Sequence, residues 1–133
     1  MMNREDLKAA CLRRLNESAT EHPAGHQGKL AARYLLRGQG GEVMELMFEK
    51  GPKTPANLWV AASRVGQLLE DNSLGHRLAP ASVLNAVKGF NGKPIYGRHS
   101  ALKPMRELAY ADLVCFQITA LTQLDRVINH LMG

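Results

Sequence analysis

The chain has 133 residues, of which 45% are hydrophobic, 22% are charged and only 5% are aromatic, and its formal net charge is +5. This length and composition exclude a disordered chain and predict a single domain, residues 1–133, with one core. We find no apolar run near the 18 residues that a membrane span needs and no cleavable leader. The sequence therefore predicts a soluble cytoplasmic protein without a membrane partner.

The first two predicted elements are helices. Apolar residues recur at helical spacing over 3–20, with charged residues on the opposite side, which predicts an amphipathic helix. Pro and Gly in 21–28 end it, and a second helix is predicted over about 27–37, before the Gly-rich stretch 37–41. The apolar positions that carry the two periodicities are Leu7, Cys11 and Leu15 in the first helix and Leu30, Tyr34 and Leu35 in the second.

Three segments have the pattern of strands. In 42–50 apolar side chains alternate with glutamates, which predicts a half-buried strand, and a turn at 51–55 leads to a partner strand over 56–62 that contains Trp59. Residues 112–118 have the composition of a third strand. The alternation places Met44, Leu46 and Phe48 opposite Glu45 and Glu49 in the first strand, and Val114, Phe116 and Ile118 opposite Leu113 and Cys115 in the last.

The remaining segments are predicted to be helices or turns. Residues 63–72 favour a short helix, and Pro80 suits the first position of another over about 80–90. We expect Ser100 to cap a short turn and Thr119 to be the N-cap of a closing helix. The buried positions expected in these segments are Val65, Leu68 and Leu69 in the first helix, Val83, Leu84 and Val87 in the second, Leu102 in the turn, and Leu121, Leu124, Ile128 and Leu131 in the closing helix.

This order of elements predicts an α+β fold. We expect two N-terminal helices, a short mainly antiparallel sheet and a C-terminal helix in one small domain. The strands are too few and too closely grouped for a parallel sheet in which helices and strands alternate.

Neither the cysteines nor the histidines are predicted to form a metal site. Cys11 and Cys115 lie in separate elements without a second ligand nearby, so we expect two buried free thiols rather than a disulfide. His22 and His26 stand four residues apart, but Pro23 lies between them and predicts a loop, not a helix with two ligands. We therefore expect no metal and no cofactor.

The positive charge is concentrated in one part of the chain. No Asp or Glu occurs between Asp71 and Glu107, a window with six basic residues: Arg77, Lys88, Lys93, Arg98, Lys103 and Arg106. Of the 17 basic residues in the chain, the other 11 are balanced by all 12 acidic residues. A nearly neutral body with one positive segment is the pattern of a protein that binds a polyanion.

The candidate site is the basic Gly/Pro-rich loop at about 88–106. Its cations would bind phosphate groups, Tyr96 would stack on a base, and backbone N–H groups near Ser100 would bind an oxygen beside the forked guanidinium of Arg98. The sequence thus predicts a nucleic-acid-binding accessory domain, with DNA and RNA both open as partners. The predicted binding residues are Lys88, Lys93, Tyr96, Arg98, His99, Ser100, Lys103 and Arg106.

Two alternative functions stay open. The same loop suits a protein-interaction module, either a regulator or an inhibitor, that docks on an acidic partner surface. The second alternative is a small nuclease, for which a metal-dependent mechanism would use Glu45, Glu49 and Lys50, and a metal-free mechanism would use His99 as general acid.

The sequence favours a binding protein over an enzyme. Ser100 and Lys103 match the S-x-x-K pattern of penicillin-interacting serine enzymes, but the rest of that signature is absent. The glycine-rich patterns of nucleotide hydrolysis and dinucleotide binding do not occur either. We therefore predict no catalytic residue.

Overall fold

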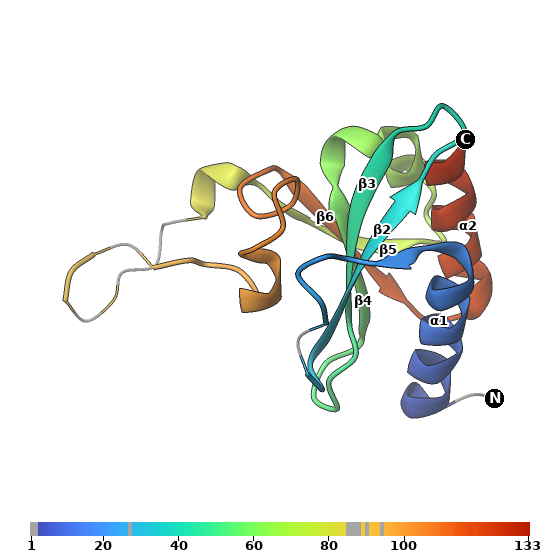
Figure 1. The fold of residues 1–133 in the computed structure, drawn as a ribbon, viewed down its shortest axis with the longest axis horizontal. Coiled ribbons are helices and arrows are strands. Elements are labelled where there is room, and N and C mark those ends of the chain that lie inside the picture. Colours follow the sequence, from blue (N-terminus) through green and yellow to red (C-terminus); the bar gives the residue numbers. More distant parts are fainter. Residues whose placement is uncertain (1–2, 27, 85–88, 90, 94) are drawn as a thin grey trace.

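Six strands and two helices make up the regular structure of the described residues (Figure 1). The structure is a computed structural model that describes residues 3–26, 28–84, 89, 91–93 and 95–133. Within these ranges, neither helix combines the length and the apolar character that crossing a bilayer requires. The bounds are α1 Arg4–Ser18, β1 Thr20–Glu21, β2 Ala31–Arg37, β3 Val43–Glu49, β4 Ala56–Ala61, β5 Gly75–Ala79, β6 Leu113–Ile118 and α2 Leu121–Met132, with short 3-10 helices at Ala62–Arg64, Gly66–Glu70, Ala81–Val83 and Ser100–Leu102.

All neighbouring strands are antiparallel, in the order β1-β2-β3-β4-β6-β5. β6 lies between β4 and β5, so the last strand of the chain takes an inner position and β5 forms one edge. β2 and β3 are paired along their whole length, from Ala31 opposite Glu49 onward. The strands predicted at 42–50, 56–62 and 112–118 are confirmed as β3, β4 and β6.

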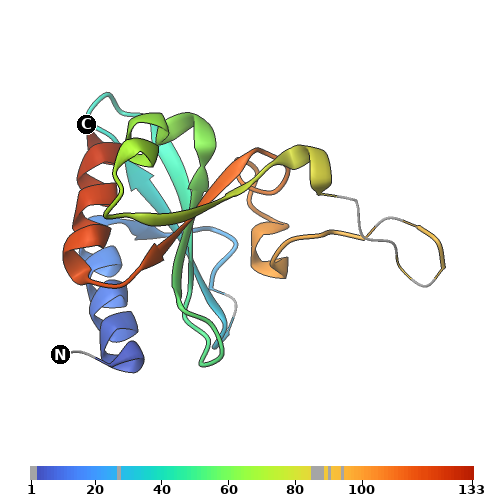
Figure 2. The ribbon, with the colours of Figure 1, turned by 180° about the vertical axis from the view of Figure 1, so that it is seen from behind.

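One face of the sheet is covered by α1 and α2, which lie side by side at one end of the molecule (Figures 1 and 2). α1 confirms the helix predicted over 3–20, and Asn3 caps it by accepting a hydrogen bond from the Asp6 N–H at 2.8 Å. α2 confirms the closing helix, although its N-cap is Ala120 and not Thr119. The core between helices and sheet includes Leu7, Cys11 and Leu15 of α1, Met44, Leu46 and Phe48 of β3, Val114, Phe116 and Ile118 of β6, and Leu124, Ile128 and Leu131 of α2.

The opposite face of the sheet packs against residues 99–112. Leu102 and Leu108 from this segment form a second apolar cluster with Met47 and Trp59 of the sheet. The described part of 81–98 extends away from the sheet, at the end of the molecule opposite α1 and α2 (Figures 1 and 2). The predicted basic loop is therefore carried on the face of the sheet that the helices leave open.

The α+β class stands, but the prediction of two N-terminal helices is wrong. Residues 31–37 form β2 and not a second helix. Its apolar residues lie on both sides of the strand, with Tyr34 toward the helices and Ala31 toward residues 99–112. A short segment that is buried on both sides has a continuous apolar pattern, which helices and strands share. Pairing with β3 over seven residues decides the conformation.

The prediction of a short sheet is also wrong, because two strands have weak sequence signals. β5 is an edge strand whose residues are mostly exposed, so it shows no apolar alternation. β1 has only two residues. The helices predicted over 63–72 and 80–90 are short 3-10 helices in their described parts, Val83 is exposed, and Val87 lies outside the described residues.

Both cysteines are free and buried, as predicted for Cys11 and Cys115. Cys11 packs in the core beneath the helices, and Cys115 packs in the cluster on the other face of the sheet. Burial disfavours the thiolate and raises the pKa of each thiol to about 11.

Candidate functional site

The residues of the predicted basic loop fall into two groups. Lys93, Lys103 and Arg106 are exposed, and none of them forms an ion pair with an acidic residue in the described ranges. Tyr96, Arg98 and His99 are half-buried and hold the loop on the rest of the molecule. Ser100 is exposed and begins the 3-10 helix Ser100–Leu102, and Lys88 lies outside the described residues.

Arg98 ties three parts of the chain together. One terminal nitrogen of its guanidinium donates a hydrogen bond to the Ala79 carbonyl at 2.7 Å, at the end of β5. The other donates to the carbonyls of Leu108 and Ala109, both at 3.2 Å. These bonds occupy the forked guanidinium that the sequence assigned to phosphate, and they join the loop to the sheet edge.

Tyr96 is anchored in the same way. Its hydroxyl donates to the Ala109 carbonyl at 2.7 Å, and burial raises the pKa of the hydroxyl above its ordinary value. The Tyr96 ring stands edge-on to the ring of Tyr110, with 5.9 Å between the ring centroids. Tyr110 is 62% exposed, so it presents to solvent the aromatic surface that the sequence assigned to Tyr96.

His99 caps the turn in which the sequence placed an anion site. Its Nδ1 accepts a hydrogen bond from the Ala101 N–H at 3.1 Å, so one of the backbone donors expected to bind an anion near Ser100 already has a partner. Because Nδ1 is an acceptor, the proton of the neutral imidazole lies on Nε2. Nε2 faces Glu49, with 3.8 Å between it and Oε1.

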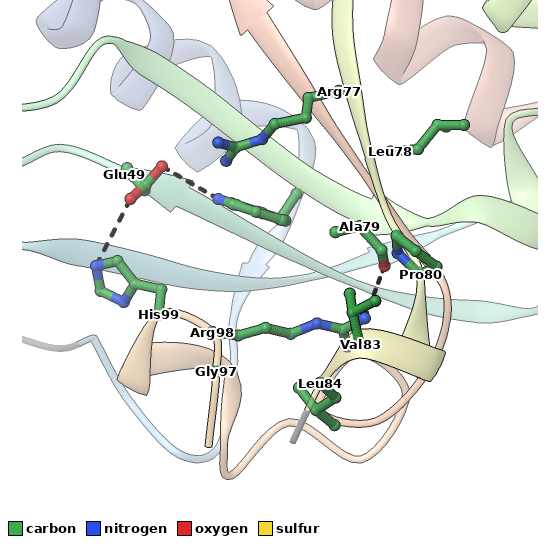
Figure 3. A pocket seen from close by; sticks show the side chains of 11 residues that line it. Glu49, Arg77, Leu78, Ala79, Pro80, Val83, Leu84, Gly97, Arg98 and His99 are labelled. Atoms are coloured by element: carbon green, nitrogen blue, oxygen red, sulfur yellow. Dashed lines mark hydrogen bonds and ion pairs between the residues drawn. The ribbon is translucent and has the colours of Figure 1, made fainter. Parts of the chain in front are cut away.

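A pocket of about 460 Å³ lies where the loop meets the sheet (Figure 3). Its polar side is formed by Glu49, Arg77 and His99, and Trp59 lines it as well. Its other side is formed largely by apolar residues from the end of β5 and the segment after it. These are Ala79, Pro80, Val83 and Leu84. The volume is within the range of small-molecule sites, about 300–1,000 Å³.

Glu49 is the buried acid of this pocket, with 8% of its side chain exposed. Its Oε2 accepts hydrogen bonds from the Asn57 side-chain amide at 2.6 Å and from the Trp59 indole N–H at 3.1 Å. Both donors come from β4, because the register that pairs Met47 with Trp59 continues to place Asn57 opposite Glu49. The carboxylate is thus held in one orientation, with Oε1 on the side of His99.

Arg77 is a second cation of the pocket, besides Arg98. The sequence places it in the acid-free window but assigns it to no site. It extends from the edge strand β5, and its guanidinium lies over the Trp59 ring, 5.3 Å from the ring centroid. Because the sequence does not predict β5, it gives no signal for the contact between Arg77 and Trp59. The alternation in β3 and β4 could have placed Glu49, Asn57 and Trp59 together, since all three have the same parity relative to the buried face.

Glu45 fixes the other end of the loop segment. Its Oε1 accepts hydrogen bonds from the backbone N–H groups of Glu107 at 2.6 Å and Leu108 at 3.2 Å. His22 Nε2 donates to Oε2 at 2.5 Å, since its Nδ1 accepts from the Ala24 N–H. Glu107 in turn is paired with Arg64, at 2.6 Å. Glu45 therefore has protein donors on both oxygens.

The two acids of the metal-dependent nuclease hypothesis do share a face of β3, as the sequence predicts. Glu45 and Glu49 nevertheless bind separate sets of protein donors. In the described part of the chain, no group of three or more His, Cys, Asp and Glu side chains is arranged to hold a metal ion. His99 likewise has one ring nitrogen bonded to backbone and the other turned toward Glu49.

A second, smaller pocket extends the basic surface beyond the loop. It has a volume of about 220 Å³ and is lined by His99 together with Lys53 and other residues of the turn between β3 and β4. Lys53 thus lies next to the loop although 46 positions separate it from His99 in the sequence. The basic residues near the loop are therefore not limited to the acid-free window.

No protein-family model matches the chain, and no curated protein or solved structure showed significant similarity to it.

Proposed function

We propose that the protein is a cytoplasmic accessory domain that binds single-stranded nucleic acid through the exposed cations of residues 88–106. The proposal rests on one observation: Lys93, Lys103 and Arg106 all face solvent in a stretch of chain that contains no Asp or Glu. Arg98 and Tyr96 fix the same stretch to the sheet. A positive surface on a fixed support favours phosphate binding, because less backbone has to become ordered when the cations bind.

An exposed aromatic ring that packs against the loop favours single strands over duplexes. Tyr110 is 62% exposed and is supported from the side by Tyr96. Stacking of an unpaired base on such a ring contributes about 1–3 kcal/mol. In a duplex the bases are already stacked on one another, so this contribution is available mainly from a single strand.

The test is a fluorescence-anisotropy titration of a labelled mixed-sequence single strand of about 16 nucleotides. Four phosphate contacts, three from the loop cations Lys93, Lys103 and Arg106 and a fourth from exposed Arg77 on the neighbouring strand β5, would give a slope of about −2.8 in a plot of log affinity against log salt. A rise from about 50 to about 200 mM salt should then weaken binding about fiftyfold. Binding that is absent at low salt, or that does not depend on salt, would overturn the proposal.

A pair of charge-reversal variants locates the surface. Replacing Lys93→Glu and Lys103→Glu together should weaken binding at low salt by about tenfold or more, since attraction becomes repulsion at two contacts. The matched control is Arg4→Glu with Arg13→Glu, which changes the net charge equally. Both arginines are exposed on α1, at the end of the molecule opposite the loop (Figure 1). Equal losses from both double variants would mean that only net charge counts.

A second candidate is a protein-interaction module with an acidic partner, and exposed apolar residues around the loop favour it. Leu78, Val83 and Ile95 are 59%, 57% and 45% exposed, and they accompany Tyr110 at this end of the molecule. Apolar contacts with such residues would supply affinity, while the cations guide association. A stoichiometric protein partner recovered without nucleic acid would support this candidate over the first.

A further inference from the structure

The pocket beside the loop contains a buried acceptor that its own surroundings do not satisfy. Glu49 Oε2 has two donors, but among the described residues no donor reaches Oε1 within hydrogen-bond distance. His99 Nε2, at 3.8 Å, is too far. The side chain is 92% buried, and its Oε1 borders the pocket (Figure 3). A buried carboxylate oxygen without a donor is costly, so a ligand that brings an N–H group to this oxygen gains affinity.

The charges around the pocket favour a neutral donor over a cation. Two guanidinium groups, those of Arg77 and Arg98, line the pocket with the single carboxylate of Glu49. An ammonium or guanidinium ligand would enter a region that already has more positive than negative charge. A ligand with a neutral N–H edge and a linked anionic group fits both the Glu49 oxygen that lacks a donor and the excess of positive charge. Its edge would bind Glu49, and its anion would bind exposed Arg77.

The apolar side of the pocket favours a flat ligand. Pro80, Val83 and Leu84 face the polar side across the pocket (Figure 3). Trp59 adds an aromatic surface, although Arg77 already lies over its ring. A nucleobase has two apolar faces and a hydrogen-bonding edge, and its sugar carries the phosphate. The pocket volume of about 460 Å³ is large enough for a ligand of small-molecule size.

We propose that this pocket binds a guanine base of the single strand, with Glu49 accepting hydrogen bonds from its N–H edge and Arg77 contacting its phosphate. Guanine is the base whose Watson–Crick edge carries two adjacent donors, N1–H and the 2-amino group, and a carboxylate is their natural acceptor. Adenine and cytosine each offer one amino group beside a ring acceptor, which Glu49 would repel. This inference rests on the proposed function, for which it supplies base specificity.

The test uses mononucleotides and the indole N–H of Trp59, the sole tryptophan, as an NMR probe. Because this N–H donates to Glu49, its single cross-peak should move when a ligand reaches the carboxylate. Guanosine 5′-monophosphate should bind at least about tenfold more tightly than adenosine 5′-monophosphate, the discrimination expected of a good two-donor contact. Equal affinities for the two nucleotides would overturn the proposal, and so would preferential binding of agmatine, a guanidinium ligand.

Two variants separate the base contact from the phosphate contact. Glu49→Gln should abolish the preference for guanine, whereas Glu42→Gln, an exposed glutamate outside the pocket, should keep it. Arg77→Gln should reduce the affinity for guanosine 5′-monophosphate to that of guanosine and leave the guanine preference intact, so the proposal stays testable if Glu49→Gln fails to fold. Guanine preference retained by a folded Glu49→Gln variant would overturn it.

Failure of this proposal and failure of the proposed function give different results. Lys93→Glu with Lys103→Glu should weaken binding of the oligonucleotide but leave guanosine 5′-monophosphate in the pocket. If the oligonucleotide binds with the expected salt dependence and no mononucleotide is preferred, only the guanine site is overturned. If guanosine 5′-monophosphate binds and the oligonucleotide does not, the proposed function is overturned and the guanine site remains.

Discussion

Arg98 should contribute to stability through its hydrogen bonds, and its replacement by Met measures this contribution. The guanidinium donates to three carbonyl oxygens, those of Ala79, Leu108 and Ala109. Hydrogen bonds from charged donors contribute about 1.5–3 kcal/mol each, and the partial exposure of the side chain reduces this to about 1 kcal/mol each. Arg98→Met should therefore lower the free energy of unfolding by about 3 kcal/mol.

Thermal unfolding followed by circular dichroism gives the readout. For a domain of 133 residues, about 3 kcal/mol corresponds to a fall in Tm of about 12 °C. Lys103→Met is the control, because Lys103 is exposed, and it should change stability by about 0.5 kcal/mol or less. Arg98→Lys should recover only part of the loss, since one ammonium group cannot reach both sets of carbonyls. Equal melting temperatures for the two Met variants would refute this role of Arg98.

Two further predictions concern the pocket wall and the thiols. Gly97→Ala should destabilise the fold by about 1–3 kcal/mol in a denaturant titration, because a Cβ at Gly97 would stand 2.4 Å from the Leu84 carbonyl oxygen. Gly66→Ala is the control, because its Cβ meets open space, and it should change stability very little. A Gly97→Ala variant as stable as the unaltered protein would show that Gly97 and Leu84 are not in close contact. Cys11 and Cys115 should react about a hundredfold more slowly with a thiol reagent at pH 8 than unburied thiols do, since their pKa rises from 9.0 to about 11. This raised pKa contributes stability that is present below pH 9 and is lost as the pH rises toward 11. Labelling of the native protein as fast as that of unburied thiols would contradict the raised pKa.

The elements that the sequence predicted best alternate apolar with polar residues at a clear period, whether or not the polar side is buried in the fold. α1 and β3 belong to this class, and their periods of 3.6 and 2 are visible in the apolar positions. β2 does not, because Tyr34 and Ala31 pack on opposite sides of it and the period disappears. β5 shows no apolar alternation either, because an exposed edge strand needs few apolar residues.

The sequence predicted the positive charge of the candidate site but not the contacts that its residues make. The acid-free window identifies the basic loop, but nothing local distinguishes Arg98, which binds three carbonyls, from Lys103, which faces solvent. That distinction arises only in the folded chain, where the carbonyls of residues 108 and 109 lie next to Arg98. Glu49 has the alternation of a solvated glutamate in the sequence, and only the contacts with β4 and His99 make it a buried acceptor.

The central claim is that a localised set of exposed cations binds the phosphates of a single strand. Its most direct test is the salt slope of oligonucleotide binding by the Lys93→Glu, Lys103→Glu variant, compared with the unaltered protein. Each lost contact removes about 0.7 from the slope, so the slope should become shallower by about 1.4. A slope that stays the same in this variant, or that changes as much in Arg4→Glu with Arg13→Glu, would contradict the claim.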